Sequence, residues 1–146
     1  MAVTVVARWD PGWFGFEYGL LTEYSVWEQV LISYGVDRRI FVPKLMVSST
    51  LEQYNTLDEA LANVSGQKVF LEKAERAVEI GREPVFLKNF QHPKDAVYIF
   101  GNTPTDNSSW VEEDDVLLSI DIPYDGDMFG FTVVGIVLYD RSTKEA

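Results

Sequence analysis

Short hydrophobic runs suited to β-strands alternate along the chain with segments of helical spacing. Five runs rich in β-branched or alternating apolar residues predict strands, at residues 3–7, 39–42, 67–72, 96–100 and 116–122. Residues 83–87 predict a further, shorter extended segment. Strands that alternate with helical segments are typical of an α/β domain with a mostly parallel sheet, and this is the fold class that we expect.

Helical spacing is clearest over residues 20–34, where apolar side chains recur every three or four positions. Gly35 follows this segment as a predicted C-cap. A shorter helix is predicted over residues 56–64, because Thr56 and Glu59 have the spacing of a capping box.

Two other segments have patterns that fit a helix less clearly. Residues 73–80 predict one or two helical turns. Residues 131–140 are rich in β-branched side chains around a central Gly135, so their propensity favours a strand. Their spacing also allows a buried helix, and the residues alone leave this choice open.

Composition predicts one soluble domain spanning residues 1–146. The sequence has no run of 18 apolar residues and no basic lead at its start, so we expect neither a membrane span nor a signal peptide. It has no cysteine and one histidine, His92, which excludes disulfides, thiolate metal sites and multi-histidine zinc sites. We expect a cytoplasmic protein without a metal site.

The net charge of −11 comes from 23 acidic and 12 basic residues. Nucleic-acid affinity depends on Lys and Arg side chains that displace counterions. The local basic cluster in this sequence consists of Arg38, Arg39 and Lys44. The acidity therefore indicates a role in solubility, with only a thin surface for RNA.

Three stretches in order resemble the SpoU/TrmH branch of the SPOUT superfamily, which are knotted α/β methyltransferases that use S-adenosylmethionine. GLLTEYSVWEQVLISYGVDRRIFVP is similar to the family's opening helix, its Gly-Val-Asp turn and the strand that follows. AVYIFGNTPTDNSSW is similar to its strand followed by Phe-Gly-Asn-Glu-Gly. IDIPYDGDMFGFTVVGIVLYDR is similar to its Ile-Pro turn and terminal helix. The resemblance covers about residues 20–141.

This resemblance implies that residues 129–140 form a C-terminal helix, tucked through a loop to make a trefoil knot. It also implies that three loops cradle the adenosine of S-adenosylmethionine through backbone groups, where small residues let the backbone approach a ligand. The implied methyl acceptor is an RNA ribose 2'-hydroxyl, and the implied assembly is a homodimer in which the terminal helix packs. The implied cofactor-binding residues are Phe100, Gly101, Asn102, Ile122, Pro123, Met128, Phe129, Gly130 and Thr132.

The sequence departs from the family's pattern at the positions where the family has its polar and charged functional side chains. Gln29 stands at the position of the family's helical arginine, and Glu23 stands at that of its asparagine. Thr103 replaces the glutamate that follows Phe-Gly-Asn. Methyl transfer to a hydroxyl needs an activated oxygen and donor groups that hold the adjoining phosphate. The candidate catalytic residues are Gln29, Asn102, Thr103 and Arg8.

Several polar residues outside these motifs have ordinary structural interpretations. His92 lies in a polar loop, where a histidine is usually solvated, and a catalytic role is the alternative. The acidic run at residues 112–115 is typical of a solvated turn, although such a run also suits a divalent cation. Asp121, Asp125 and Asp127 either form turns or accept hydrogen bonds from a bound nucleoside.

Residues 8–19 predict a loop that contains two Trp, two Phe and one Tyr. Such rings stack on bases or a sugar, or they cover the end of the sheet or a dimer contact. Packing is the interpretation that we favour. Under the stacking alternative, Arg8 and Glu17 are the charges that face the substrate.

The first hypothesis for function is a methyltransferase-like protein that binds S-adenosylmethionine and transfers the methyl group to an RNA ribose 2'-hydroxyl. The alternative is a catalytically silent knotted protein that binds a nucleoside or another protein. A third possibility is a cofactor-using enzyme that acts on a small molecule, which an acidic chain tolerates better than RNA. The first two differ in whether a basic side chain such as Arg8, Arg38 or Lys44 reaches the adenosine loops.

Overall fold

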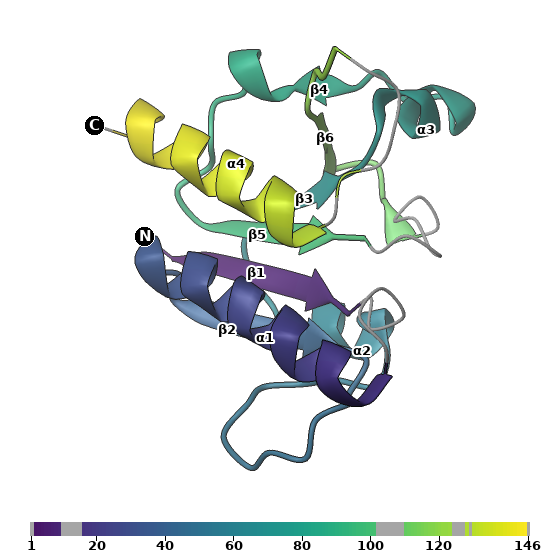
Figure 1. Ribbon diagram of the computed structural model, residues 1–146. Helices are drawn as coiled ribbons and strands as arrows, with labels where there is room; N and C mark the ends of the chain where they lie inside the picture. Colours follow the sequence, from purple (N-terminus) through teal and green to yellow (C-terminus); the bar gives the residue numbers. More distant parts are fainter. Residues whose placement is uncertain (1, 10–15, 102–109, 124–127, 129, 146) are drawn as a thin grey trace.

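Six parallel strands form one sheet at the centre of the protein (Figure 1). The computed structural model describes residues 2–9, 16–101, 110–123, 128 and 130–145, apart from the side chains of residues 16–18. The spatial order of the strands is β2-β1-β5-β3-β6-β4, and every pairing is parallel. The strands are β1 (Val3–Arg8), β2 (Arg38–Val42), β3 (Gln67–Leu71), β4 (Val85–Phe86), β5 (Ala96–Phe100) and β6 (Val116–Ser119). The expected α/β class with a parallel sheet is confirmed.

Helices cover both faces of this sheet. Two long helices, α1 (Phe16–Ser33) and α4 (Gly130–Lys144), lie side by side on one face and share a hydrophobic core with it (Figure 1). Two short helices, α2 (Leu57–Ala62) and α3 (Ala74–Glu79), pack into a second core on the other face. A 3-10 turn, η2 (Leu87–Asn89), follows β4. Among the described helices, none combines the length and apolar character that crossing a bilayer requires.

Most predicted strands and helix ends agree with the structure. The strand prediction at residues 96–100 matches β5, and β1, β2 and β3 differ from their predictions by one residue at one end. Thr56 caps α2, because its hydroxyl oxygen accepts a hydrogen bond of 3.2 Å from the backbone N–H of Glu59. Gly35 has a φ of 64°, the left-handed conformation expected of a glycine that follows a helix.

Two predictions need correction. The loop predicted over residues 8–19 is shorter, because α1 begins at Phe16 and β1 includes Arg8. Gly19 and Leu20 are both buried, so packing of the first helical turns outweighs the weak helix propensity of glycine. The strand predicted over residues 116–122 also ends early, at Ser119.

The segment whose secondary structure the sequence left open is the helix α4, as the resemblance implied. Its buried side chains are spaced three or four positions apart, so burial of one helical face outweighs the β propensity of its Val and Ile residues. The helix also continues four residues beyond Asp140. The buried side chains are Val134, Val137, Leu138 and Arg141.

The side chain of His92 is buried, which corrects the expectation of a solvated loop histidine. This side chain is 1% exposed. The ring lies between Tyr98, whose hydroxyl is 2.7 Å from Nδ1, and Asp140, whose Oδ2 is 2.7 Å from Nε2. Burial lowers the pKa of His92 and outweighs the opposing hydrogen bond to Asp140. The neutral ring therefore donates from Nε2 to the carboxylate and accepts the Tyr98 hydroxyl proton at Nδ1.

Two basic side chains of α4 complete this polar cluster. Arg141 donates to the Tyr98 hydroxyl at 2.9 Å and to the carbonyl oxygen of Pro93 at 2.7 Å. Lys144 contacts Asp140 at 2.9 Å and donates to the carbonyl oxygen of Leu87 at 2.6 Å. These bonds fix the C-terminal half of α4 to η2 and to the loop that precedes β5.

Candidate functional site

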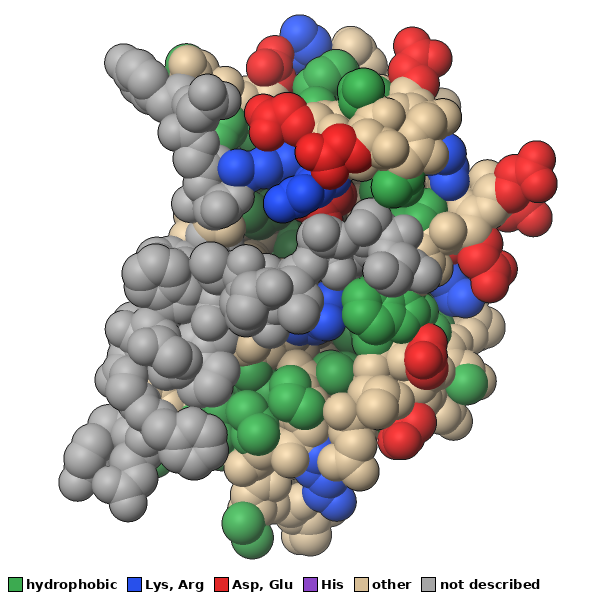
Figure 2. Space-filling view, turned by 90° about the vertical axis from the view of Figure 1, so that its right-hand side faces the viewer, with side chains coloured by type: hydrophobic (Ala, Val, Ile, Leu, Met, Phe, Trp, Pro, Cys, Tyr) green, Lys and Arg blue, Asp and Glu red, His purple; other side chains and the backbone are tan. Residues whose placement is uncertain are grey.

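The carboxyl ends of all six strands lie at one edge of the sheet, because the strands are parallel. Figure 2 shows this edge facing the viewer, with acidic, basic and apolar side chains intermingled on it. Open α/β sheets bind ligands beyond this edge. The register pairs Ala7 with Phe100, so Arg8 and Gly101 are the next residues along neighbouring strands β1 and β5.

Two of the three predicted loop regions meet at this edge. A Cβ atom on Gly130, the first residue of α4, would lie 3.3 Å from the carbonyl oxygen of Gly101. The same atom would lie 3.0 Å from Cζ2 of Trp27, which belongs to α1. The Trp27 ring meets Phe100 edge-on, with centroids 5.8 Å apart. We call this group of Trp27, Phe100, Gly101 and Gly130 the edge junction. At position 130 it accommodates a glycine, and a larger side chain would crowd Trp27 and Gly101.

The remaining predicted cofactor-binding residues in the described part of the chain surround this junction less closely. Ile122 and Pro123 are exposed and follow β6, which lies two strands from β5, or about 10 Å at the usual strand spacing. Met128 is half-buried just before α4, and Thr132 is exposed on its first turn. A ligand the size of a nucleoside is needed to span from β5 to β6.

Several predicted site residues lie outside the described residues. These are Asn102, Thr103, Phe129, Asp125 and Asp127, together with the side chain of Glu17.

Gln29, at the family's arginine position, is exposed on α1. It is two residues from the buried Trp27, so the two side chains point to opposite sides of the helix. The structure therefore does not bring Gln29 to the edge junction.

Of the two catalytic candidates that the structure describes, Gln29 and Arg8, Arg8 is the one that lies at the carboxyl edge. Its guanidinium carbon lies 4.9 Å from the ring centroid of Trp110, a cation–π distance. Trp110 is itself fixed by a hydrogen bond of 2.9 Å from its Nε1 to Asp58 in the first turn of α2. Arg8 is thus a buried cation held at the end of β1, next to β5, the strand that Gly101 follows.

The basic cluster of Arg38, Arg39 and Lys44 is divided between internal ion pairs and an exposed loop. Arg38 is at the amino end of β2 and donates to Glu52 from Nε at 2.9 Å, while Arg39 pairs with Glu28. These two cations are committed to carboxylates of the same chain. Arg38 also lies at the edge opposite to the edge junction, because it begins its strand.

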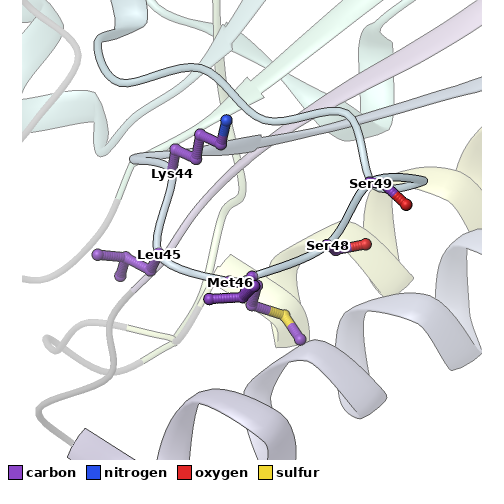
Figure 3. A pocket seen from close by; sticks show the side chains of 6 residues that line it. Lys44, Leu45, Met46, Ser48 and Ser49 are labelled. Carbon is purple, nitrogen blue, oxygen red and sulfur yellow. The ribbon is translucent and has the colours of Figure 1, made fainter.

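Lys44 belongs to a fixed loop beyond the end of β2. Residues 44–49 line a hollow in which Met46 points toward α1 and Lys44 points away (Figure 3). Gln53 fixes the loop, because its Oε1 accepts from the backbone N–H groups of Leu45 at 3.1 Å and Met46 at 3.0 Å. The hollow is formed by this one loop and contains none of the predicted site residues.

The acidic residues form turns and ion pairs. The backbone N–H of Glu112 donates to Asp115 at 2.8 Å, which closes the turn before β6. Asp121 lies 3.7 Å from the ammonium of Lys88. In the described part of the chain, no three acidic or histidine side chains gather as metal ligands would.

The aromatic segment before α1 contributes at least one packing residue. Trp9 is 1% exposed and stacks on Phe41, with ring centroids 4.7 Å apart. Tyr24 of α1 tilts against the same pair. For Trp9, the packing interpretation is therefore confirmed.

Sequence reasoning missed Trp27 and Glu23 as site residues. From the sequence, Trp27 was expected only to be an apolar position of the helix predicted over residues 20–34. Glu23 was noted only as the residue at the family's asparagine position. In the structure both are 1% exposed, and the Nε1 of Trp27 donates to Oε2 of Glu23 at 3.1 Å. The signal available in the sequence was a glutamate four residues before a tryptophan on the buried side of a helix.

No protein-family model matches the sequence, and no curated protein matches it closely enough to count as a relative. Solved structures do resemble the fold. A structure described as giving insights into the 2-OH methylation of C/U34 on tRNA has a TM-score of 0.66 and 10% sequence identity, and it covers 99% of this chain and 91% of that one.

Two further structures have the same level of similarity. A probable methylase family protein from Haemophilus influenzae has a TM-score of 0.62 and 11% identity over 98% of this chain and 65% of its own length. An AdoMet-bound rRNA methyltransferase from Sinorhizobium meliloti has a TM-score of 0.62 and 15% identity over 97% of this chain and 55% of its own. The chain thus spans little more than half the length of the latter protein. The sheet and helices described above are a fold that this chain shares with RNA methyltransferases.

Proposed function

We propose that this protein binds S-adenosylmethionine at the edge junction as a SPOUT-type methyltransferase-like protein, with an RNA ribose 2'-hydroxyl as the methyl acceptor. The observation that carries the proposal is the approach of Gly130, at the start of α4, to the carbonyl group of Gly101. Two backbone segments that meet with so little side chain between them are suited to hold a nucleoside by main-chain groups. The likeness in fold to tRNA and rRNA methyltransferases supports the same assignment.

The residues at the edge junction fit an adenosine cofactor. The backbone N–H groups in the first turn of α4 and the carbonyl group of Gly101 offer both hydrogen-bond donors and acceptors. Ile122 and Pro123, which are exposed after β6, offer apolar contact to a ligand. When bound, S-adenosylmethionine supplies an electrophilic methyl group. In this proposal the terminal helix is threaded through the preceding loop as a trefoil knot, which holds these segments together.

Arg8 is the side chain that we assign to the methyl acceptor. It stands at the carboxyl edge beside Gly101, whereas Gln29 points away. Its guanidinium rests on Trp110, so the charge is already fixed before a phosphate arrives. Arg8 thus takes over the phosphate-holding role of the arginine that this chain lacks in α1.

Ligand titration tests the proposed function. Purified protein should bind S-adenosylhomocysteine saturably in isothermal calorimetry, and Gly130→Trp should weaken the binding at least about tenfold, or about 1.4 kcal/mol. Gly130→Ala is a milder variant in case the tryptophan prevents folding, which circular dichroism would show.

Gly135→Ala is the matched control, because it changes another glycine of α4. Its added Cβ would meet Val30 at 3.9 Å, an ordinary contact, so binding should be unchanged. Absence of saturable binding at about millimolar ligand would overturn the proposal.

A catalytically silent nucleoside-binding protein is the second candidate function. The observation that favours it is the pairing of Arg38 with Glu52 and of Arg39 with Glu28, which balances the charge of two of the three cations in the basic cluster. Transfer of labelled methyl groups from S-adenosylmethionine to bulk RNA separates the two candidates. Transfer that is lost in Arg8→Gln supports the active enzyme, and binding without transfer supports the silent protein.

We also propose that the protein is a homodimer that pairs through the outer faces of α1 and α4. Ile32 and Tyr139 are 63% and 61% exposed on these faces, and Leu21 and Ile136 are exposed beside them. Residues 130–139 include no charged side chain. In a chain of net charge −11, so large an uncharged surface is suited to burial against a second copy.

A further inference from the structure

Trp27 lies against both backbone segments of the edge junction. Its ring carbons Cζ2 and Cη2 are 3.0 and 3.1 Å from the place where a Cβ on Gly130 would be. From that same place the carbonyl oxygen of Gly101 is 3.3 Å away, and the ring also meets Phe131 edge-on at 6.5 Å. Because protein interiors are close-packed, the size of this ring sets how near the first turn of α4 comes to the end of β5.

Glu23 fixes the orientation of that ring. Its Oε2 accepts the indole N–H of Trp27 at 3.1 Å, and both side chains are 1% exposed. A hydrogen bond from an indole to a carboxylate is charge-assisted, so it strongly favours one of the two ways in which the ring could be turned. Glu23 therefore acts through Trp27, not on a ligand directly.

We infer that Trp27, oriented by Glu23, sets the width of the nucleobase site at the edge junction and is its specificity-determining residue. The inference rests on the proposed function, because the base in question is the adenine of the cofactor. With the full indole in place, the junction admits an unsubstituted purine and excludes one that carries a bulky group. A smaller ring at position 27 leaves room for a larger base beside the backbone of Gly101 and Gly130.

The test compares two ligands on two proteins. S-adenosylhomocysteine and its N6-benzyl analogue are titrated into the wild type and into Trp27→Phe, which removes the ring carbons nearest Gly130. The wild type should prefer the parent ligand by about a hundredfold, and Trp27→Phe should bind the benzyl analogue at least about tenfold more tightly than the wild type does. A gain in affinity for the larger ligand cannot come from general loss of structure.

Two variants of Glu23 test its positioning role. Glu23→Gln keeps an acceptor for the indole N–H and should retain the preference for the parent ligand. Glu23→Leu removes the acceptor and should lose that preference. Equal preference in both variants would overturn the part assigned to Glu23.

A ligand-free measurement tests the geometry by itself. Gly130→Ala should lower the melting temperature in the wild type and lower it less in Trp27→Phe, because the added methyl group then has room. The inference would be overturned if Gly130→Ala lowered the melting temperature equally with and without Trp27→Phe. It would also be overturned if the wild type bound the benzyl analogue as tightly as the parent ligand. If the wild type binds neither ligand, the proposed function itself fails, whereas binding of the parent without the expected gain in Trp27→Phe overturns only the role of Trp27.

Discussion

His92, the one histidine of the chain, lies where α4 meets β5, with charged groups close to it on the helix side. Asp140 accepts a hydrogen bond from its Nε2–H, and Arg141 donates to the hydroxyl of Tyr98, which faces Nδ1. Lys144 pairs with Asp140 as well. Burial also raises the pKa of Tyr98, so its hydroxyl stays protonated and donates a hydrogen bond to His92. A proton added to His92 would turn Nδ1 from an acceptor into a donor opposite another donor.

We expect the free energy of unfolding to fall as the pH drops below about 6.5, the ordinary pKa of histidine. The pKa of His92 is lower in the folded protein, so the unfolded chain takes up the proton first and acid favours unfolding. The stabilising contribution is complete above the unfolded-state pKa and is lost as the pH falls through the folded-state pKa. Urea denaturation at about pH 7.5 and about pH 5 measures the loss.

His92→Gln is the control for this pH dependence, because glutamine does not titrate. The variant should be less stable at neutral pH by about 1–3 kcal/mol, the usual cost of disturbing a buried hydrogen-bonded group. Its stability should change less between the two pH values than that of the wild type. An equal change in the free energy of unfolding between the two pH values in both proteins would contradict the assignment to His92.

Asp140 causes a second loss of stability in the same cluster, at lower pH than the loss caused by His92. Burial alone would raise its pKa, but hydrogen bonds from His92 and Lys144 outweigh burial and lower the pKa below the usual 3.8. The folded state therefore holds the proton less readily than the unfolded chain, and stability falls again as the pH drops below about 4. The two steps occur in different pH ranges.

Among the elements, most strands and some helix ends could be predicted from local residues, but the start of α1, the end of β6 and the longest ambiguous segment could not. The apolar run at residues 96–100 is buried along its whole length, as its composition predicts, and Thr56 needs only the backbone N–H of Glu59, three positions later, to act as a cap. The last helix has the propensity of a strand, and its helical state follows from burial against α1 and the sheet. Such packing partners are far away in the sequence.

The cap of α2 carries a direct prediction. Thr56→Ala should lower the free energy of unfolding by about 1 kcal/mol, because it leaves the N–H of Glu59 without its side-chain acceptor. The change should be measurable because α2 is short and contributes Leu57 and Ala60 to the core. Chemical denaturation at neutral pH measures it.

Thr56→Ser retains the hydroxyl and is the matched control for the cap. It should be within a few tenths of a kcal/mol of the wild type. A loss in Thr56→Ser as large as that in Thr56→Ala would show that the methyl group of Thr56, and not its oxygen, stabilises the helix.

The candidate site shows the same division between local and distant information. Phe100 and Gly101 could be predicted as a strand end from their own neighbourhood, and the resemblance to a family added Gly130. The contact of Gly130 with Trp27 could not be predicted, because it joins α4 to α1 across most of the chain. His92 was missed for the same reason, since its partner Asp140 is 48 positions away.

At the scale of the whole molecule, the proposed dimer gives a test that needs no ligand. The double variant Ile32→Asp/Ile136→Asp places charges on the outer faces of both long helices, and it should raise the dimer dissociation constant by about a hundredfold or more. Light scattering coupled to size-exclusion chromatography should show a dimer for the wild type and a monomer for the variant.

Val78→Asp is the control for added charge, because Val78 is 66% exposed on α3, on the other face of the sheet. It should leave the wild-type mass unchanged. A monomeric wild type at about 100 µM, or a double variant that stays dimeric, would contradict the proposed interface.

The place of β5 in the sheet has a consequence for synthesis of the protein. β5 alone joins the pair β2-β1 to the trio β3-β6-β4, although it is the fifth strand to leave the ribosome. A nascent chain that stops before Ala96 therefore holds β1 and β3 with no strand between them; β1 then has one unpaired backbone edge and β3 has two, because both of its partners come later. The domain assembles late in translation, and until then those edges are the surfaces for a chaperone to shield.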